Sequence, residues 1–206
     1  MDIEYVLPDQ IEKRSFEIIE SELGDRKIPD DIKPVVLRVI HTTADFDYYD
    51  NLCFSENAVG VFQELIKKGA VIVTDTNMAR SGINKKALEK NGCEAFCFMS
   101  DEDVAAAAKA NGTTRATASV DKASKIGRPV IYAVGNAPTA LIRLAEHIRN
   151  GTFRPDFVIA VPVGFVNVVA SKEMIMQCGV PYIAARGRKG GSNVAAAICN
   201  AMLYMM

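Results

Sequence analysis

Hydrophobic residues in the first third of the chain recur at the spacing of helices. This periodicity predicts helices over residues 9–24, 30–41 and 55–68. The apolar residues that fall roughly on one face of the first helix are Ile11, Phe16, Ile18, Ile19 and Leu23. The expected N-cap residues are Asp30 or Asp31 for the second helix and Ser55 for the third. The chain is therefore expected to begin with a helical segment.

From residue 70 onward the pattern changes to short apolar runs, each followed by a polar or glycine-rich turn and a helix. The predicted strands are residues 70–74, 93–99, 129–134, 157–161 and 182–185. Further helices are predicted near 101–111 and 115–126, and an apolar helix over 193–206 covers either the core or a partner subunit. Nearly continuous apolar strands between helices are typical of parallel strands that are buried on both faces. We predict a single α/β domain over residues 1–206, with three layers, a mostly parallel five-stranded sheet, helices on both faces and a helical N-terminal segment.

Composition narrows the class of protein. Of the 206 residues, 49% are hydrophobic and 24% charged, and the formal net charge is -1. A wholly disordered chain is excluded, and the basic excess of a nucleic-acid binder is missing. No apolar run reaches the roughly 18 residues of a membrane span, and the acidic, periodic N-terminus does not resemble a signal peptide. A cytoplasmic protein is expected, with neither nucleic acid nor membrane as a partner.

Cysteine and histidine usage makes several kinds of site improbable. The five cysteines show no CxxC spacing, and there are only two histidines. A disulfide framework, a zinc ribbon and a His-rich metal site are therefore not expected. Cys93 and Cys97 lie in an apolar run and are predicted to be buried thiols. The P-loop, the dinucleotide fingerprint after the first strand, the G-x-S-x-G elbow and the H-E-x-x-H zinc motif are all missing.

Unusual sequence follows four of the predicted strands, in the segments 74–82, 135–141, 162–166 and 186–192. Parallel sheets bind ligands at the carboxyl ends of their strands, so these loops are expected to share one edge. Glycines allow close approach, and helix N-termini suit carboxylate or phosphate groups. The last loop, RGRKGGS, adds three cations. Ordinary turn chemistry explains any one of these loops, but together they indicate a site for an anionic ligand.

His41 is the most informative titratable residue. It ends the predicted second helix, where the helix dipole stabilises a cation by about 0.3–1 kcal/mol and so favours an imidazolium that can transfer a proton. Asp45 and Asp47 follow closely and add to this effect if the fold brings them near. The alternative is a capping histidine with no other role. His147 also lies near a helix end and is expected to be a solvated flanking residue.

Taken together, these segments resemble the precorrin-8X methylmutase family, whose members move a methyl group on the corrin ring in cobalamin biosynthesis. The matching segments span nearly all of the chain and are EKRSF at 12–16, HTTAD at 41–45, GAVIVTDTNMARSGI at 69–83, TR at 114–115, GNAPTAL at 135–141, PVGFV at 162–166, SKE at 171–173 and RGRKGGS at 186–192. The chain departs from the family at Ala170, where a glutamate is common, so no carboxylate role is assigned there.

The resemblance implies an isomerase that moves a methyl group from C-11 to C-12 of precorrin-8 or cobalt-precorrin-8, giving hydrogenobyrinate or cobyrinate. It implies that His41 is the catalytic acid and that the protein is a homodimer with its pocket near the subunit interface. No cofactor is expected, and any cobalt belongs to the substrate. A methyl shift of this kind needs a proton donor and a pocket that excludes water and fixes the ring, so the chemistry agrees with the residues.

The resemblance also implies a set of substrate-binding residues. They are Arg14, Ser15, Thr42, Arg115, Gly135, Asn136, Ala137, Pro138, Thr139, Gly164, Phe165, Val166, Arg186, Arg188, Lys189, Gly190, Gly191 and Ser192. Backbone groups of 135–139 and 164–166 are expected to hold carboxylates or the ring face, and the cations to neutralise substrate carboxylates. By pattern alone, Arg14 and Ser15 are surface positions.

Two other functions are compatible with an anion-binding edge. One is a corrinoid carrier without catalysis, in which His41 is only a helix cap. The other is a sugar-phosphate or nucleotide enzyme on a flavodoxin-like sheet.

Overall fold

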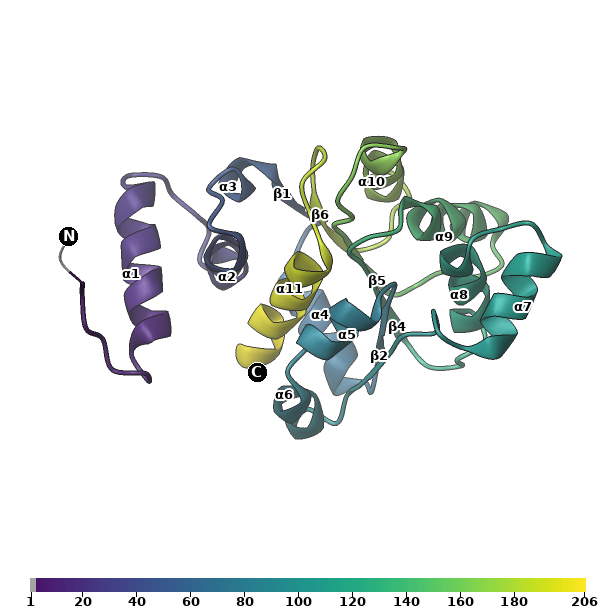
Figure 1. The fold of residues 1–206 in the computed structure, drawn as a ribbon, viewed down its shortest axis with the longest axis horizontal. Coiled ribbons are helices and arrows are strands. Elements are labelled where there is room, and N and C mark those ends of the chain that lie inside the picture. Colours follow the sequence, from purple (N-terminus) through teal and green to yellow (C-terminus); the bar gives the residue numbers. More distant parts are fainter. Residues whose placement is uncertain (1–2) are drawn as a thin grey trace.

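A computed structural model describes residues 3–206, which form one six-stranded sheet with helices packed against it (Figure 1). The strands are β1 (Leu52–Phe54), β2 (Val71–Thr74), β3 (Glu94–Phe96), β4 (Val130–Val134), β5 (Phe157–Ala160) and β6 (Tyr182–Ala185). Their order in the sheet is β1-β6-β5-β4-β2-β3. β1 is antiparallel to β6, and every other pair is parallel.

The helices of the described residues connect and flank these strands. They are α1 (Ile11–Leu23), α2 (Lys33–Thr43), α3 (Tyr48–Asn51), α4 (Ala58–Lys67), α5 (Asn77–Gly82), α6 (Lys85–Lys90), α7 (Glu102–Ala110), α8 (Arg115–Ala123), α9 (Pro138–Asn150), α10 (Val168–Met176) and α11 (Ser192–Tyr204).

The α/β class and the mostly parallel sheet are confirmed, but the expected number of five strands is wrong. All five predicted strands are present, and β1 is the sixth. β1 has only three residues and pairs with one neighbour at the edge of the sheet, so it leaves no apolar run long enough to recognise. The short helices α3 and α6 were likewise not predicted, whereas α5 and α10 are helices that were expected after β2 and β5 without stated bounds.

Side chains of the central strands alternate between two hydrophobic clusters. Ile72, Ile131 and Ile159 belong to one cluster, which contains residues of α2, α4 and α11. Their neighbours Val73 and Tyr132 belong to the other, which contains residues of α8, α9 and α10. Because successive side chains of a strand point to opposite faces, helices cover both faces of this sheet.

Helix α1 lies apart from the sheet and packs on α2, as Figure 1 shows. Its contacts are the ion pairs of Glu12 with Arg38 and of Glu20 with Lys33, together with buried Ile19 and Leu23. Ile11 and Ile18, two of the five apolar residues expected roughly on one face of this helix, are exposed. The physical reason is that α1 has one neighbouring helix, which covers only part of its apolar surface.

The predicted N-caps of the second and third helices are also wrong. Helix α2 begins after Ile32, with no side-chain cap from Asp30 or Asp31. Helix α4 begins after Asn57, and the Ser55 hydroxyl instead accepts a hydrogen bond from the backbone N–H of Tyr182 at 2.9 Å. The chain has just left β1 at this point, so Ser55 extends the contact with β6 rather than starting a helix.

The C-terminal helix α11 covers the core of its own chain, one of its two expected roles. Met202 and Leu203 are buried, and α11 packs mainly on α2 and α5. Cys93 and Cys97 are buried, as predicted. No helix within residues 3–206 has the length and apolar character that a bilayer span requires.

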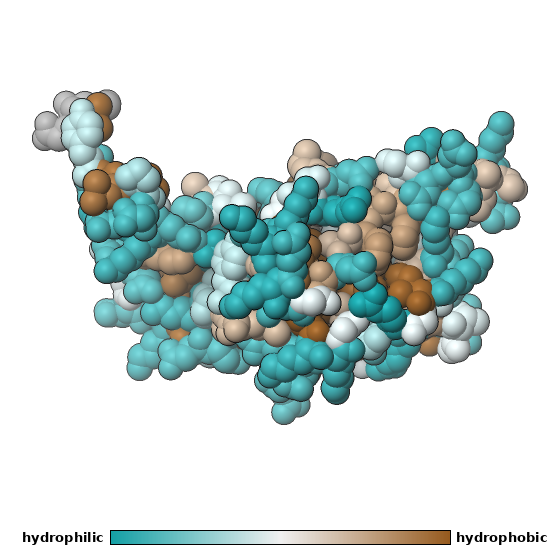
Figure 2. All heavy atoms as spheres, turned by 90° about the horizontal axis from the view of Figure 1, so that it is seen from below, coloured by the Kyte–Doolittle hydropathy of each residue, from teal (hydrophilic) through white to brown (hydrophobic). Residues whose placement is uncertain are grey.

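Surface hydrophobicity is unevenly distributed. Figure 2 shows a face on which hydrophilic residues predominate, while most of the hydrophobic residues gather at a distance from the N-terminal end. Large apolar side chains are also exposed outside the core, among them Met78, Phe165 and Val166.

The hydroxyl of Tyr132 is the buried side-chain polar atom without a hydrogen-bond partner in residues 3–206. We expect Tyr132→Phe to raise the free energy of unfolding by about 1 kcal/mol, because an unsatisfied buried hydroxyl costs stability. Tyr49→Phe is the matched control, since the Tyr49 hydroxyl donates to the Lys27 carbonyl at 3.1 Å and its loss should destabilise. Urea denaturation measures both, and equal destabilisation would show that the Tyr132 hydroxyl is satisfied in solution.

Candidate active site

The loops that follow β2, β4, β5 and β6 meet at the carboxyl edge of the sheet, as predicted. The hydroxyls of Thr76 and Ser192 lie 2.7 Å apart and join the loop after β2 to the start of α11. The Gly164 N–H donates to the Arg188 carbonyl at 3.1 Å and joins the loop after β5 to the loop after β6. The four segments therefore form one connected surface.

Asp75 joins the loop after β2 to the loop after β4. This side chain is 1% exposed, and its carboxylate accepts hydrogen bonds from the N–H groups of Gly135, Asn136 and Ala137 at 2.8, 2.8 and 2.6 Å. Burial raises the pKa of Asp75, and the three donated hydrogen bonds act against that shift. The Asp75 carboxylate therefore occupies these three N–H groups, and a role of residues 135–139 in holding a substrate carboxylate or the ring face stays a prediction.

Two glycines of the edge are required by packing. A Cβ atom at Gly135 would lie 2.7 Å from the Cα of Ser192, and a Cβ at Gly190 would collide with the Val161 carbonyl oxygen. These glycines therefore let the protein's own loops approach one another. Their role in admitting a ligand stays a prediction.

Lys172 is a fully buried lysine beneath this edge. It lies on α10, is 0% exposed, and its Nζ donates to the carbonyls of Gly187 and Lys189 at 2.9 and 2.8 Å. Burial lowers the pKa of Lys172 to about 8, because the charged ammonium is removed from water. Sequence analysis assigned this residue no role, since a lysine on a helix ordinarily faces solvent.

The lowered pKa of Lys172 predicts a pH-dependent stability. An unfolded lysine titrates near pH 10.4, so between about pH 8 and that value the unfolded chain holds a proton that the folded chain has released. Raising the pH through this window therefore favours the folded state, by up to about 3 kcal/mol. We expect the free energy of unfolding of the wild-type protein, relative to Lys172→Met, to increase between pH 7.5 and pH 10. Chemical denaturation at both pH values measures it, and a constant difference would contradict the shift.

Lys189 is already neutralised by the protein. Its Nζ lies 2.6 Å from an oxygen of Asp45 and 2.6 Å from an oxygen of Asp47. The hydrogen bond from Lys189 lowers the pKa of Asp45, and the two carboxylates raise that of Lys189. Lys189 thus ties the RGRKGGS loop to the segment that follows His41, and its expected contact with a substrate carboxylate stays a prediction.

Two arginines remain as candidates for binding an anion. Arg115 and Arg188 are exposed and form no ion pair with any of residues 3–206. The Arg188 guanidinium lies 5.3 Å from the ring centre of Phe165, which is 80% exposed. Arg115 opens α8 directly after Thr114, whose hydroxyl lies 2.9 Å from that of Thr139 at the start of α9. Arg115 thus lies beside the same edge.

Arg186 has a partner at the protein surface. Its Nε lies 3.3 Å from an oxygen of Glu173, and both side chains are largely solvent-exposed. Such a pair is weak, so a substrate carboxylate can compete for this arginine.

His41 lies in the last turn of α2, near the helix end that the sequence predicted, and its side chain is exposed. Its ring meets that of Phe16 edge to face, with the centroids 5.5 Å apart. Phe16 in turn lies under the guanidinium of Arg38, which also covers the ring of Tyr204. Helix α1 therefore supplies the wall beside the imidazole.

The other predicted residues near His41 make local contacts. Arg14 donates to Glu4 at 2.7 Å, the Ser15 hydroxyl donates to the Ile11 carbonyl, and the Thr42 hydroxyl donates to the Arg38 carbonyl. The two α1 residues are half-buried rather than freely exposed, and they directly precede Phe16.

His147 is not the solvated flanking residue that the sequence predicted. Its side chain is 11% exposed, its Nε2 lies 2.7 Å from Asp121, and its Nδ1 lies 2.7 Å from the Thr152 hydroxyl. The C-terminal end of α9 packs close to α8, so the imidazole links the two helices.

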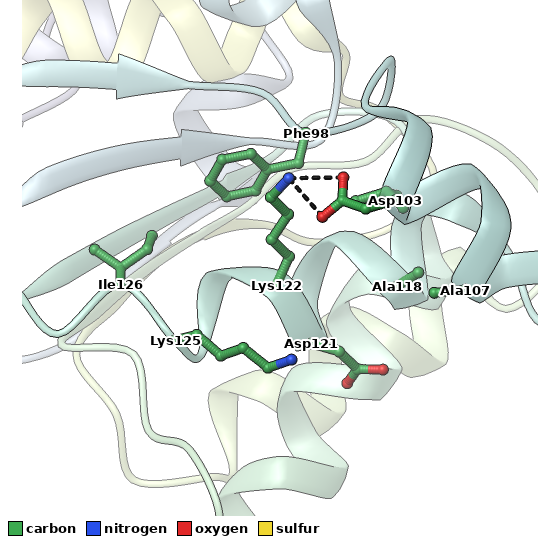
Figure 3. Close-up of a pocket in the computed structure, with 9 residues that line it drawn as sticks. Phe98, Asp103, Ala107, Ala118, Asp121, Lys122, Lys125 and Ile126 are labelled. Atoms are coloured by element: carbon green, nitrogen blue, oxygen red, sulfur yellow. Dashed lines mark hydrogen bonds and ion pairs between the residues drawn. The ribbon is translucent and has the colours of Figure 1, made fainter.

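A cavity of about 530 Å³ lies elsewhere, between α7 and α8. Figure 3 shows Lys122 beneath Phe98, directed at Asp103, to which it donates at 2.8 Å. None of the predicted site residues lines this cavity. Two aspartates and two lysines line it, so it has no formal excess of positive charge, and the strand-end loops are the better candidate for an anionic ligand.

Comparison with known proteins decides the family. The chain matches the family described as CbiC: Precorrin-8X methylmutase over residues 10–205. The chain belongs to the precorrin-8X methylmutase family. It is accordingly an isomerase that rearranges a methyl group, within cobalamin biosynthesis.

Individual relatives agree with this membership. A cobalt-precorrin-8 methylmutase of Salmonella typhimurium is 46% identical over 204 residues, covering 96% of this chain and 95% of the relative. A precorrin-8X methylmutase of Pseudomonas aeruginosa is 35% identical and covers 97% of each. The solved precorrin-8X methylmutase of Thermus thermophilus has a TM-score of 0.87 at 39% identity, covering 95% of this chain and 96% of that one.

Two residues that organise the site of this methylmutase-family protein were missed by sequence analysis. Asp75 lies in the quoted TDTNMARSG segment and Lys172 in SKE, so both were noticed as part of motifs without a role. An acid directly after a buried strand is a signal that could have singled out Asp75.

Proposed function

We propose that this protein moves a methyl group from C-11 to C-12 of precorrin-8 or cobalt-precorrin-8, giving hydrogenobyrinate or cobyrinate, with His41 as the general acid. The observation that supports it most is the meeting of four strand-end loops at one edge, where Arg115 and Arg188 form no ion pair with residues 3–206. The relatives named for precorrin-8 and cobalt-precorrin-8 support the substrate class.

The chemistry of the proposal places few demands on the protein. A methyl shift within one molecule leaves the overall oxidation state unchanged and requires no protein nucleophile. It is assisted by a proton that the acid delivers to the ring as the methyl group migrates and that the ring loses again as the product forms, so that no atom is gained overall. A pocket that fixes the ring and excludes water assists it further. His41 is the proposed proton donor, and any cobalt enters as part of the substrate.

The proposed substrate is a flat macrocycle with carboxylate groups around its edge, so its binding requires both cationic and apolar residues. Arg115 and Arg188 would bind carboxylate side chains, and Phe165 with Val166 would contact the apolar ring. Both apolar residues are 80% exposed in the single chain. Exposure of this size at the site supports the further proposal that the protein is a homodimer, with the second copy helping to enclose the pocket.

Loss of either free arginine is expected to weaken substrate binding. We expect Arg188→Ala or Arg115→Ala to raise KM about tenfold or more, because a hydrogen bond to a charged group is removed. Arg149→Ala is the matched control, since Arg149 is exposed near the opposite end of α9 and should leave KM unchanged. Steady-state kinetics measure the three variants, and equal KM values would show that the carboxylates bind elsewhere.

Incubation of the protein with metal-free precorrin-8 and with cobalt-precorrin-8, followed by visible absorption, tests the proposed reaction. Formation of the corrin chromophore from at least one of them is expected. Binding without conversion would favour a corrinoid carrier. A melting temperature that phosphate compounds raise and corrinoids leave unchanged would favour a sugar-phosphate or nucleotide enzyme.

A further inference from the structure

Lys172 combines full burial with the absence of a carboxylate partner. It forms no ion pair with residues 3–206, and Glu173 beside it pairs with Arg186 instead. Burial of a charge is costly unless the charge is paired or hydrogen-bonded. The Lys172 ammonium donates its hydrogen bonds to two backbone carbonyls of one loop. These contacts indicate that its function is to hold this loop in place.

Three consecutive backbone carbonyls of the RGRKGGS loop accept hydrogen bonds from other parts of the chain. Lys172 takes those of Gly187 and Lys189, and the Gly164 N–H takes the one between them, at Arg188. Gly187 has a φ of 77°, a left-handed conformation that turns the chain at this point. With every carbonyl of the turn directed into the protein, the side chains of the loop are left at the surface.

The two cations of the fixed turn reach opposite flanks of the site. Arg188 extends over Phe165, and Lys189 extends to Asp45 and Asp47, which follow the helix that ends near His41. A shift of the turn would therefore move Arg188 and at the same time loosen the contact of Lys189 with the segment after α2, the helix that carries His41. The buried ammonium also adds positive charge beneath an edge that is proposed to bind a polyacidic molecule.

We propose that Lys172 is a positioning residue for the methyl-shift reaction: it fixes the turn of residues 187–189 so that Arg188 meets a substrate carboxylate and Lys189 holds the segment after His41. This inference rests on the proposed function for the identity of the substrate, but the fixing of the turn can be measured without substrate. The hydrogen bonds of the Lys172 ammonium go to backbone carbonyls of its own chain.

Lys172→Met tests the proposal, because methionine keeps much of the side-chain length and removes every donor. Ile175→Ala is the matched control: Ile175 is fully buried on the same helix and contacts the core, so its loss destabilises without touching the turn. Trypsin cleavage of the folded proteins after Arg186, Arg188 and Lys189, followed by mass spectrometry, reports on the turn. We expect cleavage about tenfold faster in Lys172→Met than in Ile175→Ala when both are compared at equal distance below their melting temperatures.

Kinetics with the corrinoid substrate supply the second measurement. We expect KM to rise about tenfold in Lys172→Met, with a smaller fall in kcat, while Ile175→Ala keeps the wild-type KM. Equal cleavage rates in the two variants would overturn the fixing of the turn, whatever the protein's substrate is. Faster cleavage with an unchanged KM would overturn the positioning role, whereas a protein that converts no corrinoid would fail the proposed function and still report on the turn.

Lys172→Gln serves if the methionine variant does not fold. Its amide keeps two N–H donors without the charge, so it should restore part of the resistance to trypsin. Cleavage as fast as in a variant without donors, such as Lys172→Leu, would show that the hydrogen bonds do not hold the turn.

Discussion

Replacement of His41 by alanine is expected to lower kcat about 10²–10⁴-fold, the usual contribution of a positioned general acid. The imidazole is exposed and touches Phe16, so the free energy of unfolding should change by no more than about 0.5 kcal/mol. Visible absorption during conversion of precorrin-8 and thermal unfolding of the same preparation measure the two quantities. A large loss of rate without a loss of stability would separate the acid from a helix cap.

His147→Ala is the control that the chain itself provides, because His147 is its second histidine. Both ring nitrogens of His147 are hydrogen-bonded between α8 and α9, so its loss should cost about 1–3 kcal/mol of stability. It should leave kcat unchanged. Wild-type turnover in His41→Ala would remove the catalytic assignment and favour the corrinoid carrier.

Replacement of Asp75 by alanine is expected to lower the free energy of unfolding by about 3–5 kcal/mol. The substitution leaves the N–H groups of Gly135, Asn136 and Ala137 without their acceptor in a buried place. Asp75→Asn should fall between alanine and wild type, because its amide keeps one acceptor oxygen. Chemical denaturation measures all three proteins.

Thr76→Ala is the reference substitution against which the loss of stability in Asp75→Ala is compared. The Thr76 hydroxyl caps α5 by accepting from the Ala79 N–H at 3.0 Å, and the loss of such a cap costs about 1 kcal/mol. Equal destabilisation by Asp75→Ala and Thr76→Ala would mean that the three N–H groups find water in place of the carboxylate. The loop after β4 would then not depend on Asp75.

The local pattern of hydrophobic and polar residues was sufficient to predict most of the strands and helices. The strands β2, β4, β5 and β6 are short apolar runs because they are buried on both faces, and this burial is visible residue by residue. The place of His41 near a helix end was likewise predicted, because helix ends depend on neighbouring residues. β1 escaped notice because three residues at a sheet edge carry almost no pattern.

Pairing between distant segments could not be predicted in the same way. Lys189 and Asp45 are 144 residues apart in sequence, and Asp75 lies 60 residues from Gly135. Each of these residues is a charged group that could equally have faced water or a ligand. Only their placement in the folded chain shows that Lys189 is neutralised internally while Arg188 is left free.

The amino-acid sequence by itself determined the α/β class, the family and the edge of the sheet where the loops gather, because hydrophobic periodicity and contiguous motifs are local properties. The tertiary structure decided which polar groups at that edge serve the protein and which remain for a ligand. The physical reason is that a buried charge must find its partner wherever the fold brings one, and for Asp75 and Lys172 those partners are backbone groups that no side-chain pattern identifies.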